Sequence, residues 1–156
     1  MRREIGFALV AVLLVGCGYH PQETASVPHD AYPSAKAFLN GIKHYPYVAS
    51  TERATRLMNG AKELYRCMTK DEVASELGSP DFSELDFGPK GPNAHWLGSN
   101  WMFYISIQSD VSSSKNPSIQ IFFDTTDRAQ WIIPVGIQGA SEIGAPDLSC
   151  TEVKLT

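Results

Sequence analysis

Three absences limit what this 156-residue chain can be. It has no apolar run long enough to cross a bilayer, because Ile5–Val15 is well short of the roughly 20 residues that a membrane helix needs. It has no basic excess, since 13 Lys and Arg stand against 17 Asp and Glu, for a net charge of −4. Nucleic-acid binding and adhesion of the folded part to anionic lipid both need basic clusters, so we expect neither.

The sequence also lacks the motifs of common catalytic and metal sites. It contains no G-x-S-x-G elbow and no glycine-rich phosphate loop ending in Lys-Ser or Lys-Thr. The four histidines, His20, His29, His44 and His95, do not stand with cysteines or carboxylates at metal-ligand spacing. We therefore expect no enzymatic activity, no metal site and no dissociable cofactor.

The N-terminus carries a targeting signal. Arginines at positions 2 and 3 precede the apolar run, which ends in small residues, as in a secretory signal peptide. Leu14-Val15-Gly16-Cys17 resembles a bacterial lipobox, which implies that residues 1–16 are removed and that Cys17 becomes the lipid-bearing first residue. Several acyl chains would hold the protein stably at a membrane. Gly18, which is not aspartate, implies the outer membrane, with the domain facing the periplasm; an ordinary secretory signal that happens to contain a cysteine is the alternative.

Two further cysteines remain if Cys17 is acylated. Cys67 and Cys150 form an even pair, and the oxidising periplasm permits a disulfide between them. By loop-closure entropy such a long closed loop is worth about 4 kcal/mol. Two separate buried thiols are the alternative, and the spacing does not decide between them.

The chain divides into three parts. Residues 1–16 are the predicted signal peptide, and residues 17–48 read as a lipidated, proline-rich tether with a short helix near 34–42. Residues 49–156 form the predicted domain, which ends in a glycine-rich tail without clear periodicity.

Two helices are predicted at the start of the domain. Apolar residues at three- and four-residue spacing indicate a helix over Thr51–Tyr65. A second helix over Lys70–Leu77 has Thr69 and Glu72 as a capping box, with Met68 and Val73 at the positions of a hydrophobic staple. Gly78 should end it in a left-handed cap, and Pro80 should prevent its resumption.

Alternating residues then predict strands near 81–87, 101–107, 118–123 and 129–135, separated by loops over 88–99 and 110–117 and by a tight connection at 124–127. Two helices followed by adjacent antiparallel strands indicate an α+β fold. We expect a two-layer sandwich in which two N-terminal helices pack on a three- to four-stranded antiparallel sheet.

This order of parts resembles the SmpA/OmlA (BamE-like) family of outer-membrane lipoproteins. The resemblance covers about Leu64 to Ile133 and rests on "MTKDEVASELGSPDF", "WMFYISI" and "IFFD". The matching residues are Met68, Thr69, Val73, Leu77, Gly78, Pro80, Trp101 and Tyr104. The chain departs from the family pattern where Cys67 replaces the usual glycine, where loop 88–99 is longer, and where hairpin 124–128 lacks a glycine. No match exists for the segment upstream of the capped helix that the family uses in partner contacts.

The resemblance implies a non-enzymatic lipoprotein that contacts other envelope proteins, with the β-barrel assembly machinery as the nearest named partner. A periplasmic inhibitor or immunity-type protein, which uses the same sheet to occlude an enzyme or toxin, is the alternative. The candidate partner-binding residues are His95, Trp96, Leu97 and Trp101, because tryptophans in a loop on a rigid scaffold are typical of recognition sites. Trp96 folded back over the sheet edge is the structural alternative.

Overall fold

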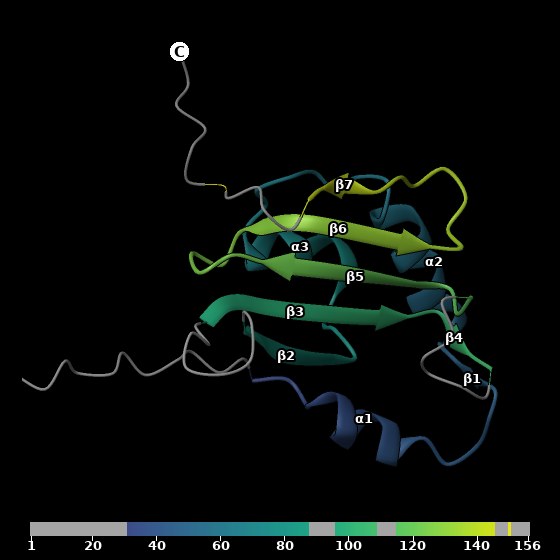
Figure 1. Ribbon diagram of the computed structural model, residues 1–156. Helices are drawn as coiled ribbons and strands as arrows, with labels where there is room; N and C mark the ends of the chain where they lie inside the picture. The colour runs from purple at the N-terminus through teal and green to yellow at the C-terminus, as the bar shows by residue number, and fades with distance from the viewer. Residues whose placement is uncertain (1–30, 88–95, 109–114, 146–149, 151–156) are drawn as a thin grey trace, which may run out of the picture.

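The computed structural model describes residues 31–87, 96–108, 115–145 and Cys150 (Figure 1). The predicted signal peptide, Cys17 and His95 lie outside these residues. No helix among the described residues is long and apolar enough to cross a membrane.

Three helices and seven strands make up the described fold. The helices are α1 (Ala35–Gly41), α2 (Thr51–Gly60) and α3 (Lys70–Leu77). A five-stranded antiparallel sheet has the order β2-β3-β5-β6-β7, and β1 pairs with β4 in a separate two-stranded sheet. The strands are β1 (Tyr47–Val48), β2 (Phe82–Phe87), β3 (Trp96–Tyr104), β4 (Ser106–Ile107), β5 (Ser118–Phe123), β6 (Ala129–Val135) and β7 (Ile143–Gly144). The predicted α+β class is confirmed. The prediction of two helices and a three- to four-stranded sheet was too low for both the helices and the strands of the described residues.

Helix α3 forms as its local signals predict. The Glu72 carboxylate accepts a hydrogen bond from the Thr69 N–H at 2.7 Å, and the Thr69 hydroxyl accepts one from the Glu72 N–H at 3.2 Å. Met68 and Val73, the predicted staple, are both buried in the same cluster. Gly78 ends the helix with φ 82° and ψ −161°. This region is essentially restricted to glycine, but it is not the left-handed helical cap that we predicted.

Helix α2 is shorter than predicted. It ends at Gly60, and the next amides, of Lys62 and Glu63, bond three residues back to Asn59 and Gly60 in tighter turns. These turns redirect the chain, so that Leu64 still enters the core although it has left the helix. A larger side chain at position 60 would crowd α3, because a Cβ there would lie 2.8 Å from Leu77 Cδ2.

The main core lies between one face of the sheet and the helices α2 and α3, which stand behind the sheet in Figure 1. Alternate residues of β3 and β5 point into it, including Trp101, Phe103, Ile119, Ile121 and Phe123, all at most 3 % exposed.

Helix α1 lies on the opposite face, beside β2. Phe38 packs against Phe82 and Tyr104, with ring centroids 6.0 and 6.1 Å apart, and Ile42 joins the same cluster. The Ser83 N–H also donates to the Pro33 carbonyl at 3.0 Å. Residues 31–48, which we assigned to the tether, therefore belong to the packed fold. The apolar face of α1 packs on Phe82 and Tyr104, which the sequence around α1 does not indicate.

Candidate interaction surface and disulfide site

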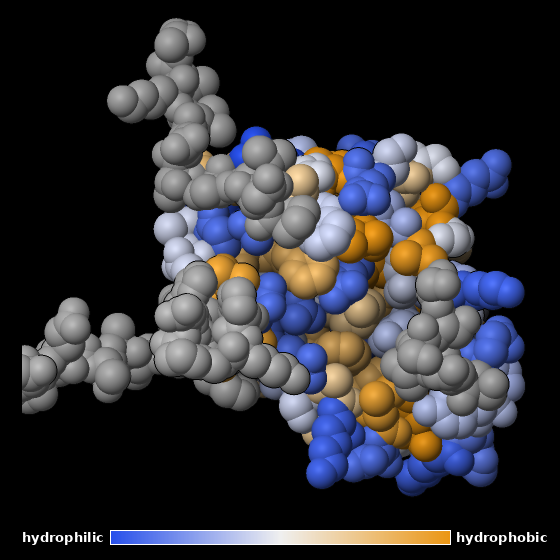
Figure 2. Space-filling view, in the orientation of Figure 1, coloured by the Kyte–Doolittle hydropathy of each residue, from blue (hydrophilic) through white to orange (hydrophobic). Residues whose placement is uncertain are grey.

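The β5–β6 part of the sheet has no helix over its second face among the described residues. Phe122 and Trp131 are cross-strand neighbours there, with stacked rings whose centroids lie 5.0 Å apart. Gln120 pairs with Ile133 in the next row of the same face. All four side chains are partly exposed. Figure 2 shows hydrophobic atoms along this side of the molecule, between polar neighbours.

Acidic side chains lie at both edges of this surface, which we call the open face. On β2, Glu84 and Asp86 alternate with Ser83 and Leu85, so they lie on the same side of the sheet as Phe82; Phe82 is buried under α1, whereas Glu84 is exposed and Asp86 partly exposed. At the other edge, the Glu142 carboxylate accepts a hydrogen bond from the Trp131 indole N–H at 2.7 Å. A partly exposed aromatic centre with acidic margins makes this surface a candidate interaction site.

The predicted binding residues are not brought together. Trp101 is 3 % exposed, with its ring 4.9 Å from that of Phe123, so it is a core residue and offers no surface to a partner. Leu97 is 38 % exposed on β3, and Trp96 begins that strand. The strand therefore starts inside the segment that we predicted to be a loop.

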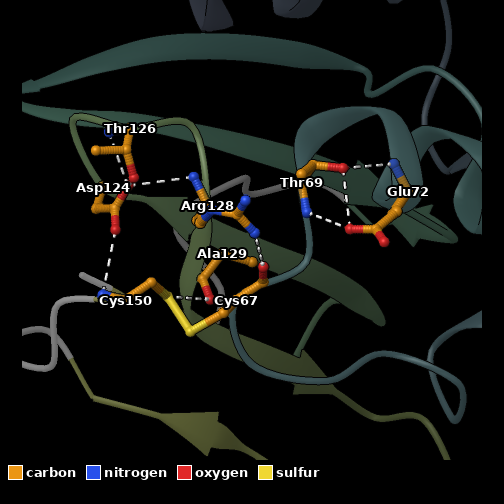
Figure 3. The surroundings of a disulfide bond; sticks show 8 residues. All are labelled: Cys67, Thr69, Glu72, Asp124, Thr126, Arg128, Ala129 and Cys150. Carbon is orange, nitrogen blue, oxygen red and sulfur yellow. Dashed lines mark hydrogen bonds between the residues drawn. A yellow bond between two sulfur atoms is a disulfide. The ribbon is translucent and has the colours of Figure 1, made fainter. Parts of the chain in front are cut away.

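A disulfide joins Cys67 and Cys150, as predicted (Figure 3). Their Cα atoms are 5.5 Å apart and 83 residues separate them in the sequence. Cys67 has φ 72°, which is uncommon for a residue with a side chain. Its N–H donates to the Ala129 carbonyl at 2.7 Å, and its own carbonyl accepts from the Arg128 guanidinium at 3.1 Å.

Asp124 organises the other side of this site (Figure 3). Its carboxylate accepts from the Thr126 hydroxyl at 2.6 Å, from the backbone N–H groups of Thr126 and Arg128, and from the Cys150 N–H at 3.3 Å. Burial alone would raise the pKa of Asp124, but these hydrogen bonds together hold that pKa below its ordinary value. The ionised carboxylate therefore fixes both the β5–β6 hairpin and the second cysteine.

A second buried carboxylate, Asp81, lies where β1, α2 and β3 meet. Asp81 accepts from the Tyr104 N–H at 2.6 Å and forms an ion pair with Arg53 at 3.0 Å, and Tyr47 donates to it at 3.4 Å. Burial raises the pKa of Asp81 above its ordinary value, although the Tyr104 N–H and Arg53 act in the opposite direction. The same carboxylate, together with burial, raises the pKa of Tyr47.

The described residues form several grooves, of which two are larger than 500 Å³. One, of about 610 Å³, runs between α1 and β1 and is lined mainly by apolar side chains, among them Phe38, Ile42 and Val48. The other, of about 530 Å³, lies beside α3 and is lined by Glu63, Tyr65, Met68, Glu72, Ser75 and Glu76. In the part of the chain that the structure describes, no group of three or more His, Cys, Asp or Glu residues could hold a metal ion.

Comparison with known proteins gives no relative. No family model, no curated protein and no solved structure matches the chain.

The residues of the open face were not identified from the sequence, although a signal was present. In "WIIPV" apolar residues fall on both sides of the alternation, and in "SIQIFF" Phe122 interrupts an otherwise polar second side, which indicates apolar surface on the second face of these strands. Phe122, Trp131 and Ile133 are the residues on the second face.

Proposed function

We propose that this protein is a non-enzymatic outer-membrane lipoprotein, acylated at Cys17, whose domain faces the periplasm and contacts a protein partner in envelope (β-barrel) assembly. The observation that carries the interaction role is the open face, where Phe122, Trp131 and Ile133 remain partly exposed on a rigid sheet. Aromatic residues in such positions are enriched at the energetic centres of protein interfaces.

The backbone of Cys67 supports the family resemblance on which the assembly role rests. The SmpA/OmlA pattern has a glycine immediately before the methionine, and Cys67 stands at that place with φ 72°. A positive φ suits glycine, so the family's usual residue fits the conformation that this chain adopts there. The cysteine adds a disulfide to a turn whose shape accommodates glycine.

The experiment is site-specific photocrosslinking in the native envelope, with the full-length chain carrying the photoreactive residue at position 133. Position 58 is the matched control, because Met58 is 42 % exposed on α2, away from the open face. We expect barrel-assembly components to crosslink from position 133 and not from position 58.

A single soluble enzyme or toxin crosslinked from position 133 would instead establish the inhibitor function. Equal crosslinking from both positions would contradict the assignment to the open face.

Lipidation is tested separately with Cys17→Ser. We expect the variant to remain uncleaved or to leave the outer-membrane fraction, because the acyl chains supply the anchor. A processed Cys17→Ser protein that still fractionates with the outer membrane would overturn the anchor, and would leave the interaction surface to be judged by the crosslinks alone.

A further inference from the structure

We infer that the open face binds a basic amphipathic α-helix of the partner protein, placed beside α1 over β5 and β6. This inference rests on the proposed function in that it names the class of partner segment for the same surface. Three properties of the face lead to it: its charge, its width and the way in which α1 already packs.

The charged side chains that the strands of this face carry are of one sign. None of the five strands contains Lys, Arg or His, and their only ionisable carboxylates are Glu84 and Asp86. Glu142 adds a third carboxylate beside Trp131, at the opposite edge. An acidic segment would meet like charge at both edges, whereas a segment with Lys or Arg flanking its apolar stripe would find an acidic partner on each side.

The width of the face fits one helix. Neighbouring strands lie about 4.8 Å apart and a helix with its side chains is about 10–12 Å across, so one helix covers roughly two to three strands. Helix α1 lies along β2 at the edge of the sheet (Figure 1), and it reaches β3 through the contact of Phe38 with Tyr104. Among the described residues no helix lies over this face of β5, β6 and β7, and their width matches one more helix in the layer of α1.

Helix α1 also shows what kind of side-chain contact this face accepts. It presents Phe38 and Ile42, four residues apart, to aromatic side chains of the sheet. The stacked pair Phe122 and Trp131, with Ile133 beside it, offers the corresponding aromatic and aliphatic contacts on the next two strands. A partner helix with apolar residues at positions i, i+3, i+4 and i+7 would reproduce the packing of α1.

The experiment is an NMR titration of the ¹⁵N-labelled mature chain with two model peptides. One is an 18-residue amphipathic Leu/Lys helix, and the other is its Leu/Glu counterpart with the same apolar stripe. We expect the Leu/Lys peptide to shift the amides of Phe122, Trp131 and Ile133 and the Trp131 indole N–H. We expect the Leu/Glu peptide to bind at least about tenfold more weakly, and the Leu/Lys affinity to fall as salt is added.

The variant Glu84→Lys/Asp86→Lys should weaken the Leu/Lys peptide about tenfold, because both charges on one edge are reversed. The matched control is Glu63→Lys/Glu76→Lys, which reverses two exposed charges in the acidic groove beside α3 and should leave the affinity unchanged. Shifts confined to that groove, or equal affinities of the two peptides, would overturn the inference.

This titration uses no lipid anchor and no envelope, so its result is independent of the crosslinking test. Binding of the Leu/Lys peptide to the open face, together with crosslinks to a soluble enzyme only, would uphold the helix site and overturn the assembly role. Crosslinks to assembly components without binding of the peptide would uphold the assembly role and overturn the helix site.

Discussion

The two faces of the five-stranded sheet are closed to very different degrees. Among the described residues, fourteen buried ones form a cluster between the sheet and α2 and α3, whereas the cluster beneath α1 contains three, Phe82, Tyr104 and Ile107. The first face is mainly apolar, with Ser99 as a buried polar residue, and is bordered by the disulfide. The second is covered by α1 only beside β2, and at β5 and β6 it carries the partly exposed aromatic pair Phe122 and Trp131. The difference indicates that one face provides most of the stability, whereas the other leaves apolar surface partly exposed, which is the surface that we propose for a partner.

Among variants that separate the two faces, loss of the disulfide should decrease stability the most. In Cys150→Ala the closed loop of 83 residues is lost, and loop-closure entropy predicts a decrease of about 4.5 kcal/mol in the free energy of unfolding. Urea denaturation measures this loss. The double variant Cys67→Ala/Cys150→Ala should have the same free energy of unfolding as the single variant to within about 1 kcal/mol. An unchanged urea midpoint in Cys150→Ala would show that the disulfide to the tail adds nothing to the stability of the main core.

Truncation of one aromatic residue on each face should show the difference directly. Phe103→Ala, at 0 % exposure in the main core, should cost about 4 kcal/mol of unfolding free energy. Phe38→Ala, on the partly buried face of α1, should cost only about 1–2 kcal/mol, because its ring remains partly solvated before truncation. Denaturation of the two variants in parallel tests this, and equal losses would mean that α1 is as essential to the fold as the main core.

The backbone strain at Cys67 predicts a smaller difference. Cys67→Gly and Cys67→Ala both remove the disulfide, but glycine adopts φ 72° without the clash that a Cβ introduces. Cys67→Gly should therefore be about 1 kcal/mol more stable than Cys67→Ala in urea denaturation. If the order is reversed, the turn at Cys67 takes a different conformation once the disulfide is gone.

The smallest effects should appear in the titration of the two buried carboxylates. The pKa of Asp124 should lie below the ordinary aspartate value, and that of Asp81 above it. Since the folded pKa of Asp124 is depressed, its stabilisation is present above the unfolded value and is lost as pH falls through the folded one. For Asp81, the sign is opposite, because the fold favours the protonated form, and stability decreases as pH rises from the unfolded to the folded pKa.

NMR titration of the two side-chain carboxyl carbons measures both values. Asp124→Asn supplies the stability test, since its deficit relative to the wild type should shrink as the solution is acidified. A deficit that does not depend on pH would mean that Asp124 contributes through shape rather than through charge.

Features encoded locally were predictable from the sequence. The capping box of Thr69 and Glu72 acts over three residues, and the alternation in β3 and β5 reports directly which side chains share a face. The disulfide was an open choice, because two cysteines 83 residues apart become neighbours only through the register of β5 and β6.

Features that depend on distant contacts were missed. The docking of α1 requires Phe38 to meet Phe82 and Tyr104, and nothing within residues 34–42 indicates that partner. Trp101 was predicted to bind a partner because tryptophan is common at interfaces. In the alternation of β3, however, it lies on the same side as Phe103 and points into the core. Strand β7 has only two residues in a glycine-rich tail, which is too short for alternation to appear.

The span of the disulfide also has a mechanical consequence. All five strands of the main sheet lie between Cys67 and Cys150, so the bond closes a covalent ring around them. When the chain is pulled from its two ends, the force can first unfold α1, β1 and α2. The described residues before Cys67 have a fully extended length of about 120–130 Å. Beyond that point the disulfide carries the force. Under load the sheet, and the open face on it, should keep its shape after the N-terminal helices have been drawn out.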